Sequence, residues 1–548
     1  KIMKRKAVAA VLTAVMVASM FTGCGSDNGS SSAKSASAAS AASAANDTVD
    51  EDGKVNGIMY QEGLPLVDEG DYTFSIFCDD SSESGEFIML DEFKKQTNVD
   101  VDLKIYPYET ATERLNLDLN SGDYADVIGG WTLSDNAILT YGVNQGVFIP
   151  LEDYFEKYCP NISAILDLPG VREKMTAPDG HIYTIPYVCA DSTVGYSPYI
   201  NTKWLENVGM SMPTTTDEFE AVLKAFKEQD ANGNGDASDE IPFSTDPNNK
   251  HIEAMAGYFG LPMNKLGIAI QNEKVVYGGV SDTYREFLSW FHKLYAEGLV
   301  DVELYTQDSP TWEGKGNQDL YGVSIAYGSN EFTGIPAAEE RGDFDSMPVL
   351  NTDKDGIWLR DTEGFSVYRT QAVITNKAEH PEIICRWFDN AFALENGIGC
   401  NRGPVGVIVN KEDDGYHAID TTTLSEEDQE KYSWGNLWPQ SLPKYLPVDF
   451  EFVEEHPMYD EKKATEEAYE ANLTKEIIPS YWIDLDKIDT FSDTNTAIKD
   501  FFEQQQAQFV CGELDIDNDA DWQAYVDGMY SLGLEDWVAT QGIEEIAK

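Results

Sequence analysis

Apolar and polar residues alternate with two different periods in the first foldable part of the chain. The alternation from Tyr72 to Cys78 predicts a strand that ends at Asp79 and Asp80. Next come a helical pattern at 87–96, a strand at 99–106, a helix at 110–120 and a strand at 125–128. Strands that alternate with helices at this spacing predict a parallel sheet with helices on its faces, so the chain belongs to the α/β class.

The C-terminal part is richer in helical patterns. Helices are predicted at 216–227, 282–297, 380–394, 496–510 and 521–532. Irregular segments near 185–198 and 328–341 interrupt the rhythm, and a chain that leaves one lobe and returns to it there makes a hinge of several strands. We therefore expect an N-terminal lobe of 71–190 plus about 342–425, and a C-terminal lobe of about 191–341 plus 426–548.

The first 24 residues predict the cellular location of the protein. A basic patch that includes Lys4 and Arg5 precedes an apolar run at 7–21, and small residues lead into Cys24. This pattern predicts a bacterial lipoprotein signal peptide at 1–23, with a lipid such as palmitate on Cys24. The alternative is a single membrane-spanning anchor, but a run of about fifteen apolar residues is short against the ~20 that a spanning helix needs. We expect the mature chain on the extracellular face of the cell membrane, in a Gram-positive host.

Residues 24–70 have no sustained apolar period. They are rich in Ser and Ala at first and then acidic, a composition that cannot bury enough surface to fold. We expect a flexible linker there. No segment after Cys24 is apolar enough to span a bilayer, so everything beyond it should be water-soluble.

Charge and cysteine content exclude two classes of site. The chain has 38 basic and 97 acidic residues, a net charge of −59 that repels phosphate backbones and argues against nucleic-acid binding. The cysteines after Cys24 are scattered, without a CxxC pair or a neighbouring histidine: Cys78, Cys159, Cys189, Cys385, Cys400 and Cys511. This spacing supports neither a zinc site nor a disulfide framework, and we expect mostly buried free thiols.

The strand ends predict where a ligand binds. In open α/β sheets, ligands lie beyond the carboxyl ends of the strands, which makes Asp79, Asp80 and Trp131 candidate ligand residues. Trp434 and Trp438 are further candidates, because two indoles stand close together in a polar stretch that contains glycine. For each aromatic residue, packing in the core is the alternative interpretation.

The segment 230–241 resembles the start of an EF-hand loop. Oxygen-bearing side chains occupy positions one, three and five (Asp230, Asn232 and Asn234), and glycine occupies position six. Position twelve is Ile241, so Asp239 and Glu240 must complete the ligand shell, while Asp236 contributes its backbone carbonyl. The oxygen count predicts a structural Ca²⁺ ion, and the alternative is an Asx-rich turn that binds nothing.

Several segments together resemble one family. Residues 180–186 (GHIYTIP) are similar to its GKIYxxP segment, 199–219 to its YxRKDWLxxxGxxxPTTxdEF segment, and 294–300 (LYAEGLV) to its LYxEGLI segment. The segments around 512–534 resemble its closing helices. The shared order identifies the chain as a member of the family 1 extracellular solute-binding lipoproteins of carbohydrate ABC importers, in the large oligosaccharide-binding branch typical of Firmicutes.

The resemblance implies a type II periplasmic-binding-protein-like fold. Two α/β lobes with a helix-rich C-terminal part would hold a sugar and deliver it to an ABC permease. By position, Asp79 and Asp80 match a polar ligand-contact turn and Trp131 matches a stacking tryptophan. Asp191 lies near an acidic contact at the first crossing, and Tyr327 near an aromatic position after a strand at 321–326.

Such a site suits the chemistry of a sugar. Carboxylates hydrogen-bond hydroxyl groups, and flat rings cover the apolar C–H faces, a role open to Trp131, Tyr327, Trp434 and Trp438. We expect a monomeric binding protein that does no covalent chemistry. The alternatives are a secreted glycoside hydrolase, which combines aromatics and carboxylates in a cleft as well, and a surface polysaccharide-binding adhesin. No GxSxG or HExxH motif supports an enzyme.

Overall fold

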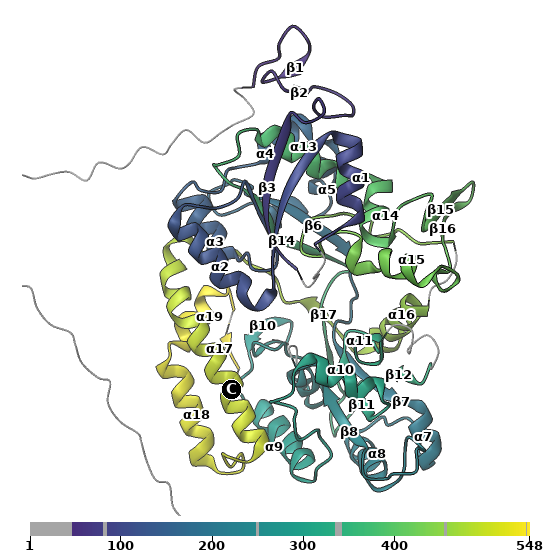
Figure 1. Ribbon diagram of the computed structural model, residues 1–548. Coiled ribbons are helices and arrows are strands. Elements are labelled where there is room, and N and C mark those ends of the chain that lie inside the picture. Colours follow the sequence, from purple (N-terminus) through teal and green to yellow (C-terminus); the bar gives the residue numbers. More distant parts are fainter. Residues whose placement is uncertain are drawn as a thin grey trace, which may run out of the picture. The chain divides into compact units, whose positions relative to one another are not determined.

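The computed structural model describes residues 47–80, 85–247, 251–334, 342–453, 457–543 and 545–547 (Figure 1). The predicted signal peptide, Cys24 and residues 24–46 of the predicted linker lie outside the described residues. Within the described ranges, no helix combines the length and the apolar character that crossing a membrane requires. The elements described below all belong to one compact unit, 41–548.

The first sheet has the strand order β4-β3-β5-β14-β6. Strands β3 (Tyr72–Asp79), β4 (Val99–Tyr106) and β5 (Val127–Gly129) run parallel, in agreement with the predicted alternation. Strand β14 (Phe365–Ile374) runs antiparallel to β5 and to β6 (Thr184–Ala190), so the sheet is mixed, which the N-terminal pattern could not reveal. Asp79 therefore lies at the carboxyl edge of the parallel strands, as predicted.

Helices accompany this sheet. They are α1 (Ile88–Thr97), α2 (Tyr108–Ser121), α3 (Asp135–Ala137), a π-helical turn (Ile138–Asn144), α4 (Glu152–Tyr158), α5 (Pro160–Leu166), α6 (Val171–Met175), α13 (Pro381–Ala391) and α14 (Leu394–Arg402). A small hairpin of β15 (Val409–Glu412) and β16 (Gly415–Ala418) follows, and then α15 (Glu426–Lys431). The helix predicted at 380–394 corresponds to α13, which ends three residues earlier, and α14 follows as a helix that was not predicted.

The second sheet has the order β12-β7-β11-β8. Its strands are β7 (Ser197–Asn201), β8 (Ile241–Thr245), β11 (Tyr321–Ala326) and β12 (Phe344–Ser346). Three smaller sheets or pairs complete the strands: β18 (Glu545–Ile546) with β10 (Lys274–Tyr277) and β9 (Ile268–Gln271), β13 (Trp358–Arg360) with β17 (Leu473–Ile477), and β1 (Lys54–Val55) with β2 (Met59–Tyr60).

Helices dominate the remainder, as the late periodicity predicts. They are α7 (Thr202–Val208), α8 (Thr216–Glu228), a 3-10 helix (Ile252–Phe259), α9 (Asp282–Ala296), α10 (Ser309–Asn317), α11 (Asn330–Thr333), α16 (Pro457–Tyr469), α17 (Ile488–Cys511), α18 (Asp519–Ser531) and α19 (Leu534–Thr540). Side chains of Thr215, Ser281 and Asn518 cap α8, α9 and α18, which explains why these helices begin where they do.

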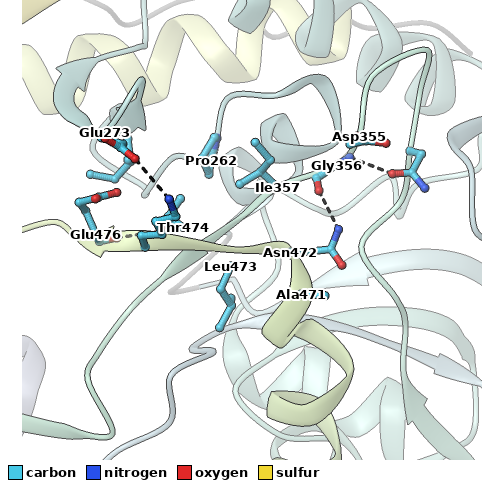
Figure 2. Close-up of a pocket in the computed structure, with 13 residues that line it drawn as sticks. Pro262, Glu273, Asp355, Gly356, Ile357, Ala471, Asn472, Leu473, Thr474 and Glu476 are labelled. Atoms are coloured by element: carbon cyan, nitrogen blue, oxygen red, sulfur yellow. Dashed lines mark hydrogen bonds and ion pairs between the residues drawn. The ribbon is translucent and has the colours of Figure 1, made fainter.

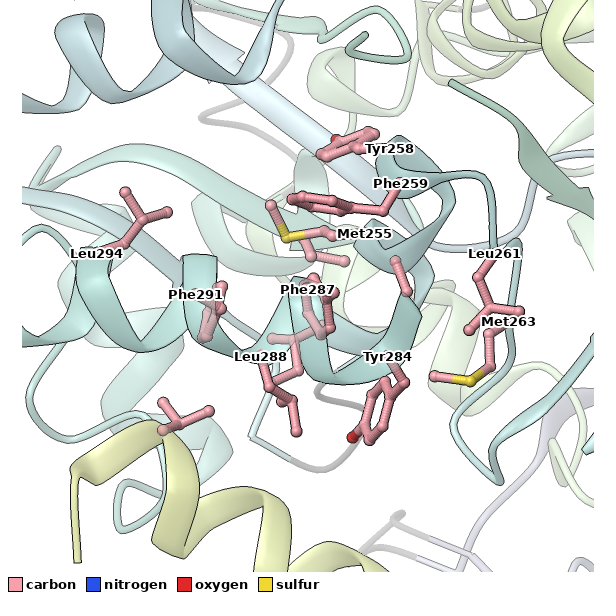
Figure 3. Close-up of a cluster of buried hydrophobic side chains, with 14 of the residues drawn as sticks. Met255, Tyr258, Phe259, Leu261, Met263, Tyr284, Phe287, Leu288, Phe291 and Leu294 are labelled. Atoms are coloured by element: carbon pink, nitrogen blue, oxygen red, sulfur yellow. The ribbon is translucent and has the colours of Figure 1, made fainter. Parts of the chain in front are cut away.

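Two large hydrophobic cores support these sheets. The first packs β3, α1 and α13 around Phe93 and Trp387. The second packs α8, α9 and α17 with the second sheet, and Figure 3 shows part of it, where Phe287 and Phe291 of α9 lie beside Met255 and Phe259. Each sheet thus has its own buried apolar support.

The cores correct the expected lobe boundaries in two places. Trp438 and Leu442, expected in the C-terminal lobe, are buried in the first core, and Phe344, expected in the N-terminal lobe, lies in the second sheet. Long-range packing decides both placements: the chain returns to the first sheet at β14, and the segment after Trp438 still lies on it, since Tyr445 forms a parallel bridge with Val188 of β6. The first crossing, between β6 and β7, coincides with the segment predicted at 185–198.

The linker expected at 24–70 is wrong for its described part. Val55, Met59, Leu66 and Val67 are buried in the first core, and Arg386 donates hydrogen bonds to backbone carbonyls of this segment. The apolar residues are few and irregularly spaced, so they give no periodic signal. Their burial nevertheless stabilises the segment against the folded domain.

Candidate functional site

Asp79 holds the loop that carries Trp131. Its carboxylate accepts hydrogen bonds from the backbone N–H groups of Trp131 (3.0 Å) and Thr132 (2.6 Å). Asp79 is fully buried, and burial raises its pKa while these hydrogen bonds oppose the rise. Because no part of the side chain is exposed, Asp79 supports the Trp131 loop, and its burial argues against the predicted direct ligand contact.

Asp80 has a similar role toward a second loop. Its side chain, 3% exposed, accepts the backbone N–H of Gln440 (2.7 Å). The Gln440 amide donates to the carbonyls of Trp434 and Trp438, both at 2.9 Å. Asp80 thus fixes the stretch between the two tryptophans, and its predicted contact with a ligand is corrected for the same reason, because the carboxylate is buried.

The two tryptophans of this stretch have opposite environments. Trp434 is 57% exposed, whereas Trp438 is fully buried against Phe93 and Trp387, with ring centroids 5.1 and 5.6 Å away. The prediction that Trp438 binds a ligand is wrong, because its indole is part of the first core. Trp434 stays a candidate.

Trp131 projects from the sheet edge onto two tyrosines. It is 45% exposed and meets Tyr368 of β14 edge-on at 5.2 Å and Tyr187 of β6 at 6.5 Å. Tyr187 and Tyr368 stack on each other at 5.5 Å. Neither tyrosine was predicted as a site residue, although Tyr187 stands on β6, which lies at the first predicted crossing.

Lys444 joins this ring cluster to Trp434. Its ammonium nitrogen lies 5.9 Å from the Tyr187 ring centroid and 5.4 Å from the Trp434 ring centroid, and it donates to the Gln440 amide oxygen at 2.7 Å. The side chain is buried, which lowers the pKa of Lys444 to about 8. A cation between two aromatic faces is attracted to both, so Lys444 stabilises the arrangement of the rings.

Asp191 and Tyr327, two of the candidate ligand residues, contact each other in the structure. The Tyr327 hydroxyl donates to Asp191 Oδ1 at 2.9 Å, and burial beside Asp191 raises the pKa of Tyr327. Ser366 and Tyr368 of β14 donate to the other oxygen of the carboxylate, Oδ2, at 2.5 and 3.4 Å. Asp191 therefore connects the end of β11 with the tyrosine that supports Trp131.

Helix α16 braces the same region with charged side chains. Lys462 donates to the carbonyls of Gly195 (2.7 Å) and Tyr327 (2.6 Å), and its nitrogen lies 3.9 Å from the Tyr327 ring centroid. Glu466 accepts from Ser192 Oγ at 2.8 Å. Burial lowers the pKa of Lys462 to about 8. The helix thus holds both segments that carry Asp191 and Tyr327.

Glu331 is an unusual carboxyl group next to this site. It accepts the backbone N–H of Tyr327 at 2.9 Å. Burial raises the pKa of Glu331 to about 7, and Asp246 contributes to the rise through charge repulsion. The proton on Glu331 is therefore expected to titrate near neutral pH.

The segment 230–240 folds as a compact loop around its own oxygens. Asp230 Oδ2 accepts the N–H of Gly235 (3.0 Å), Asn232 Oδ1 accepts that of Asn234 (3.0 Å), and Asn234 Nδ2 donates to Asp239 (2.8 Å). Asp230 Oδ1 and Glu240 Oε2 are buried without a hydrogen-bond partner. Orphaned carboxylate oxygens inside an all-oxygen loop fit a hard cation, since a cation would compensate both.

The remaining loop positions agree with that assignment in part. Asp236 accepts hydrogen bonds from the backbone N–H and the hydroxyl of Ser238 through its carboxylate, and these bonds lower its pKa, while its backbone carbonyl stays the predicted ligand. Elsewhere among the described residues, Glu412, Asp414 and His417 of the hairpin β15–β16 bring one possible ligand atom each within 4.8 Å of one another.

Two cavities lie elsewhere. One, of about 530 Å³, is lined by the 355–357 loop, β9 and the segment 471–476, and Figure 2 shows Asn472 donating to the Gly356 carbonyl across it. The other, of about 350 Å³, is lined by Asp135, Arg360 and Tyr481 among others. Neither is lined by a predicted ligand residue, and the polar groups that Figure 2 joins are paired with protein.

The profile of the bacterial extracellular solute-binding protein family matches residues 80–397, which is more than half of the chain. The chain belongs to this family. Membership in a family of solute-binding proteins supports the non-enzymatic interpretation and disfavours the glycoside hydrolase alternative.

Curated relatives of this solute-binding family member come from two Gram-positive bacteria. The fructooligosaccharide ABC transporter substrate-binding protein FusA of Streptococcus pneumoniae is 31% identical over 411 residues, 73% of this chain and 70% of FusA. The lipoprotein LipO of Bacillus subtilis is 28% identical over 280 residues, about half of each chain.

Solved structures of FusA share the fold. FusA in complex with kestose has a TM-score of 0.74 and 26% identity, and it covers 86% of this chain and 98% of FusA. A FusA EF-hand mutant in complex with fructo-nystose has a TM-score of 0.73 with the same identity and coverage. The α/β, type II periplasmic-binding-protein-like fold predicted from the sequence is confirmed.

Proposed function

We propose that this protein captures a neutral oligosaccharide of the fructooligosaccharide class and delivers it, unchanged, to the permease of an ABC importer. One observation carries the proposal: Trp131, Asp191, Tyr327 and Trp434 form a continuous set of contacts through Tyr187, Tyr368 and Lys444. The match to FusA supports the solute class.

The arrangement suits sugar recognition. Trp131 and Trp434 offer exposed ring faces to apolar C–H surfaces, whereas Asp191 and Tyr327 offer hydroxyl-bonding groups nearby. Ligand binding would favour the form of the two-lobe fold in which these groups surround the sugar, because a ligand stabilises the state that binds it best. The permease would recognise that form, with the binding protein acting as a monomer.

We infer that a structural Ca²⁺ ion is bound by the loop 230–240. Asp230, Asn232, Asn234, Asp239 and Glu240 would hold it with side-chain oxygens, and Asp236 with its carbonyl. The unpaired oxygens of Asp230 and Glu240 support this assignment, and the EF-hand of FusA is consistent with it.

We also propose that a lipid on Cys24 holds the protein to the outer face of the cell membrane. The relationship to the lipoprotein LipO and to an extracellular family supports this location. Membrane fractionation of a Cys24→Ala variant tests it: the variant should move to the medium, and retention in the membrane fraction would contradict a lipid anchor.

A thermal-shift screen of the full chain against kestose, nystose, maltotriose and galacturonate oligomers tests the proposed function. A ligand present at about 100 times its Kd stabilises the folded state by about 2.7 kcal/mol, which such an assay detects. Kestose or nystose should raise the melting temperature and be recovered intact. A shift with galacturonate oligomers alone, or release of cleaved sugar, would refute the proposal.

A further inference from the structure

We infer that Asp79 and Asp80 are positioning residues that orient the two exposed tryptophans separately, Asp79 acting on Trp131 and Asp80 on Trp434. The inference rests on the proposed sugar-binding function. It adds that two adjacent carboxylates, neither of which touches the ligand, set two different ring-stacking subsites.

Asp79 is attached to the Trp131 loop at two points. The N–H groups of Trp131 and Thr132 donate to the two oxygens of Asp79, which fixes the peptide planes on either side of the Trp131 Cα atom. Gly130 has a φ of +137°, and a Cβ atom there would lie 2.3 Å from the Asp79 carboxylate. The turn that presents Trp131 is therefore formed around this carboxylate, with glycine required for the close approach.

Asp80 is linked to Trp434 by hydrogen bonds through Gln440. Asp80 accepts the N–H of Gln440 at 2.7 Å, and the Gln440 amide donates to the Trp434 carbonyl at 2.9 Å. The amide oxygen of Gln440 also accepts from Lys444, whose ammonium faces the Trp434 ring. Asp80 and Trp434 lie 354 positions apart in the chain, so only the fold brings this relay together.

The side chains of Trp131 and Trp434 are held by different contacts. Trp131 rests edge-on against Tyr368 and Tyr187, whereas Trp434 contacts the ammonium of Lys444. Trp434 is 57% exposed, so the tertiary contacts of its own ring are few and its orientation depends on the backbone that Gln440 holds. A change at Asp80 should therefore alter the Trp434 subsite and leave the Trp131 subsite intact.

Double-mutant cycles measured by calorimetry with kestose and nystose test this pairing. Asp80→Ala should weaken binding about threefold to tenfold, the range expected when an aromatic contact is lost. In a Trp434→Ala background the same change should have no further effect, whereas in a Trp131→Ala background it should keep its full effect within about twofold. Asp79→Asn should show the reverse dependence on the two tryptophans.

Two further variants separate positioning from folding. Asp80→Asn keeps an oxygen that can accept from Gln440, so it should restore affinity to within about twofold of the wild type. Asp389→Ala is the matched control, because Asp389 is a buried carboxylate that accepts the backbone N–H of Ile162 at 2.8 Å. It should lower the melting temperature without changing the affinity for either sugar.

A fluorescence measurement without ligand tests the positioning role even if the protein binds neither sugar. Acrylamide quenching of the Trp434 contribution, obtained by difference from Trp434→Phe variants, should change in Asp80→Ala and stay unchanged in Asp79→Asn. If the wild type binds neither sugar, the proposed function is rejected and quenching alone decides the inference. Equal loss of affinity from Asp80→Ala in the presence and absence of Trp434, or unchanged quenching, would overturn it.

Discussion

Replacement of Trp131 by alanine separates ligand binding from folding. Trp131 is 45% exposed and rests on Tyr368 and Tyr187 only by its edge. Its side chain is absent from the buried apolar clusters that support the two sheets. The change should therefore remove a ring face from the site while leaving both cores intact.

The loss of affinity follows from the exposed area. A tryptophan side chain presents about 250 Å², so 45% exposure leaves about 110 Å² free, of which a sugar ring on one face covers about half. At about 25 cal/mol per Å², about 55 Å² contribute about 1.4 kcal/mol, or about tenfold in Kd. The lost edge contacts with the tyrosines cost about 0.5–1.5 kcal/mol of folding free energy, or no more than about 3 °C in Tm.

Calorimetry with kestose and a thermal melt of the same samples measure the two effects. The expected result is a Kd raised about tenfold, with a Tm within about 3 °C of the wild type. An unchanged Kd would remove Trp131 from the site. A Tm lowered by ten degrees or more would show instead that the indole supports the fold, and the reasoning from its exposure would be refuted.

Three buried groups, Trp438, Glu240 and Glu331, can be tested by stability measurements. Trp438→Ala should lower the free energy of unfolding by about 3–5 kcal/mol in urea melts, because it empties a fully buried site; a near-native midpoint would contradict its place in the core. Addition of EGTA should lower the Tm of the wild type but not that of Glu240→Gln, and equal shifts in both would argue against the loop site. Glu331 has a pKa of about 7 when folded and 4.5 ordinarily, so its contribution to stability is present below pH 4.5 and is lost as pH rises through 7. Between pH 5 and pH 8, the wild type should lose up to about 3 kcal/mol relative to Glu331→Gln in urea melts, and parallel pH profiles would exclude this titration.

The local pattern predicts the elements of the first sheet well. Strand β4 was predicted at 99–106, where the structure has it, and β3 and α8 end within one residue of their predicted ends. In these elements the apolar period and the burial agree, because each has one face on a core. The described linker residues 47–70 were missed, since their burial depends on contacts with α13 rather than on any local period.

The candidate site was predictable in its residue types but not in its pairings. The sequence places Asp79 and Asp80 at a strand end, yet their partners stand 52 and 360 positions later. Trp434 and Trp438 look alike in the sequence, and contact with Phe93 and Trp387 decides which indole is buried. Tyr187 and Tyr368 carry no motif, so only the register of β6 with β14 reveals that they stack.

Neighbouring residues in the stretch around Gln440 have different structural roles. Trp438 anchors the interior, Trp434 faces solvent, and a single amide side chain holds the carbonyls of both. Because the backbone is held independently of the exposed ring, position 434 is free to accept other side chains at little cost to folding. Replacement of residue 434 by each of the other amino acids should therefore yield binding proteins with altered sugar preference and an unchanged fold.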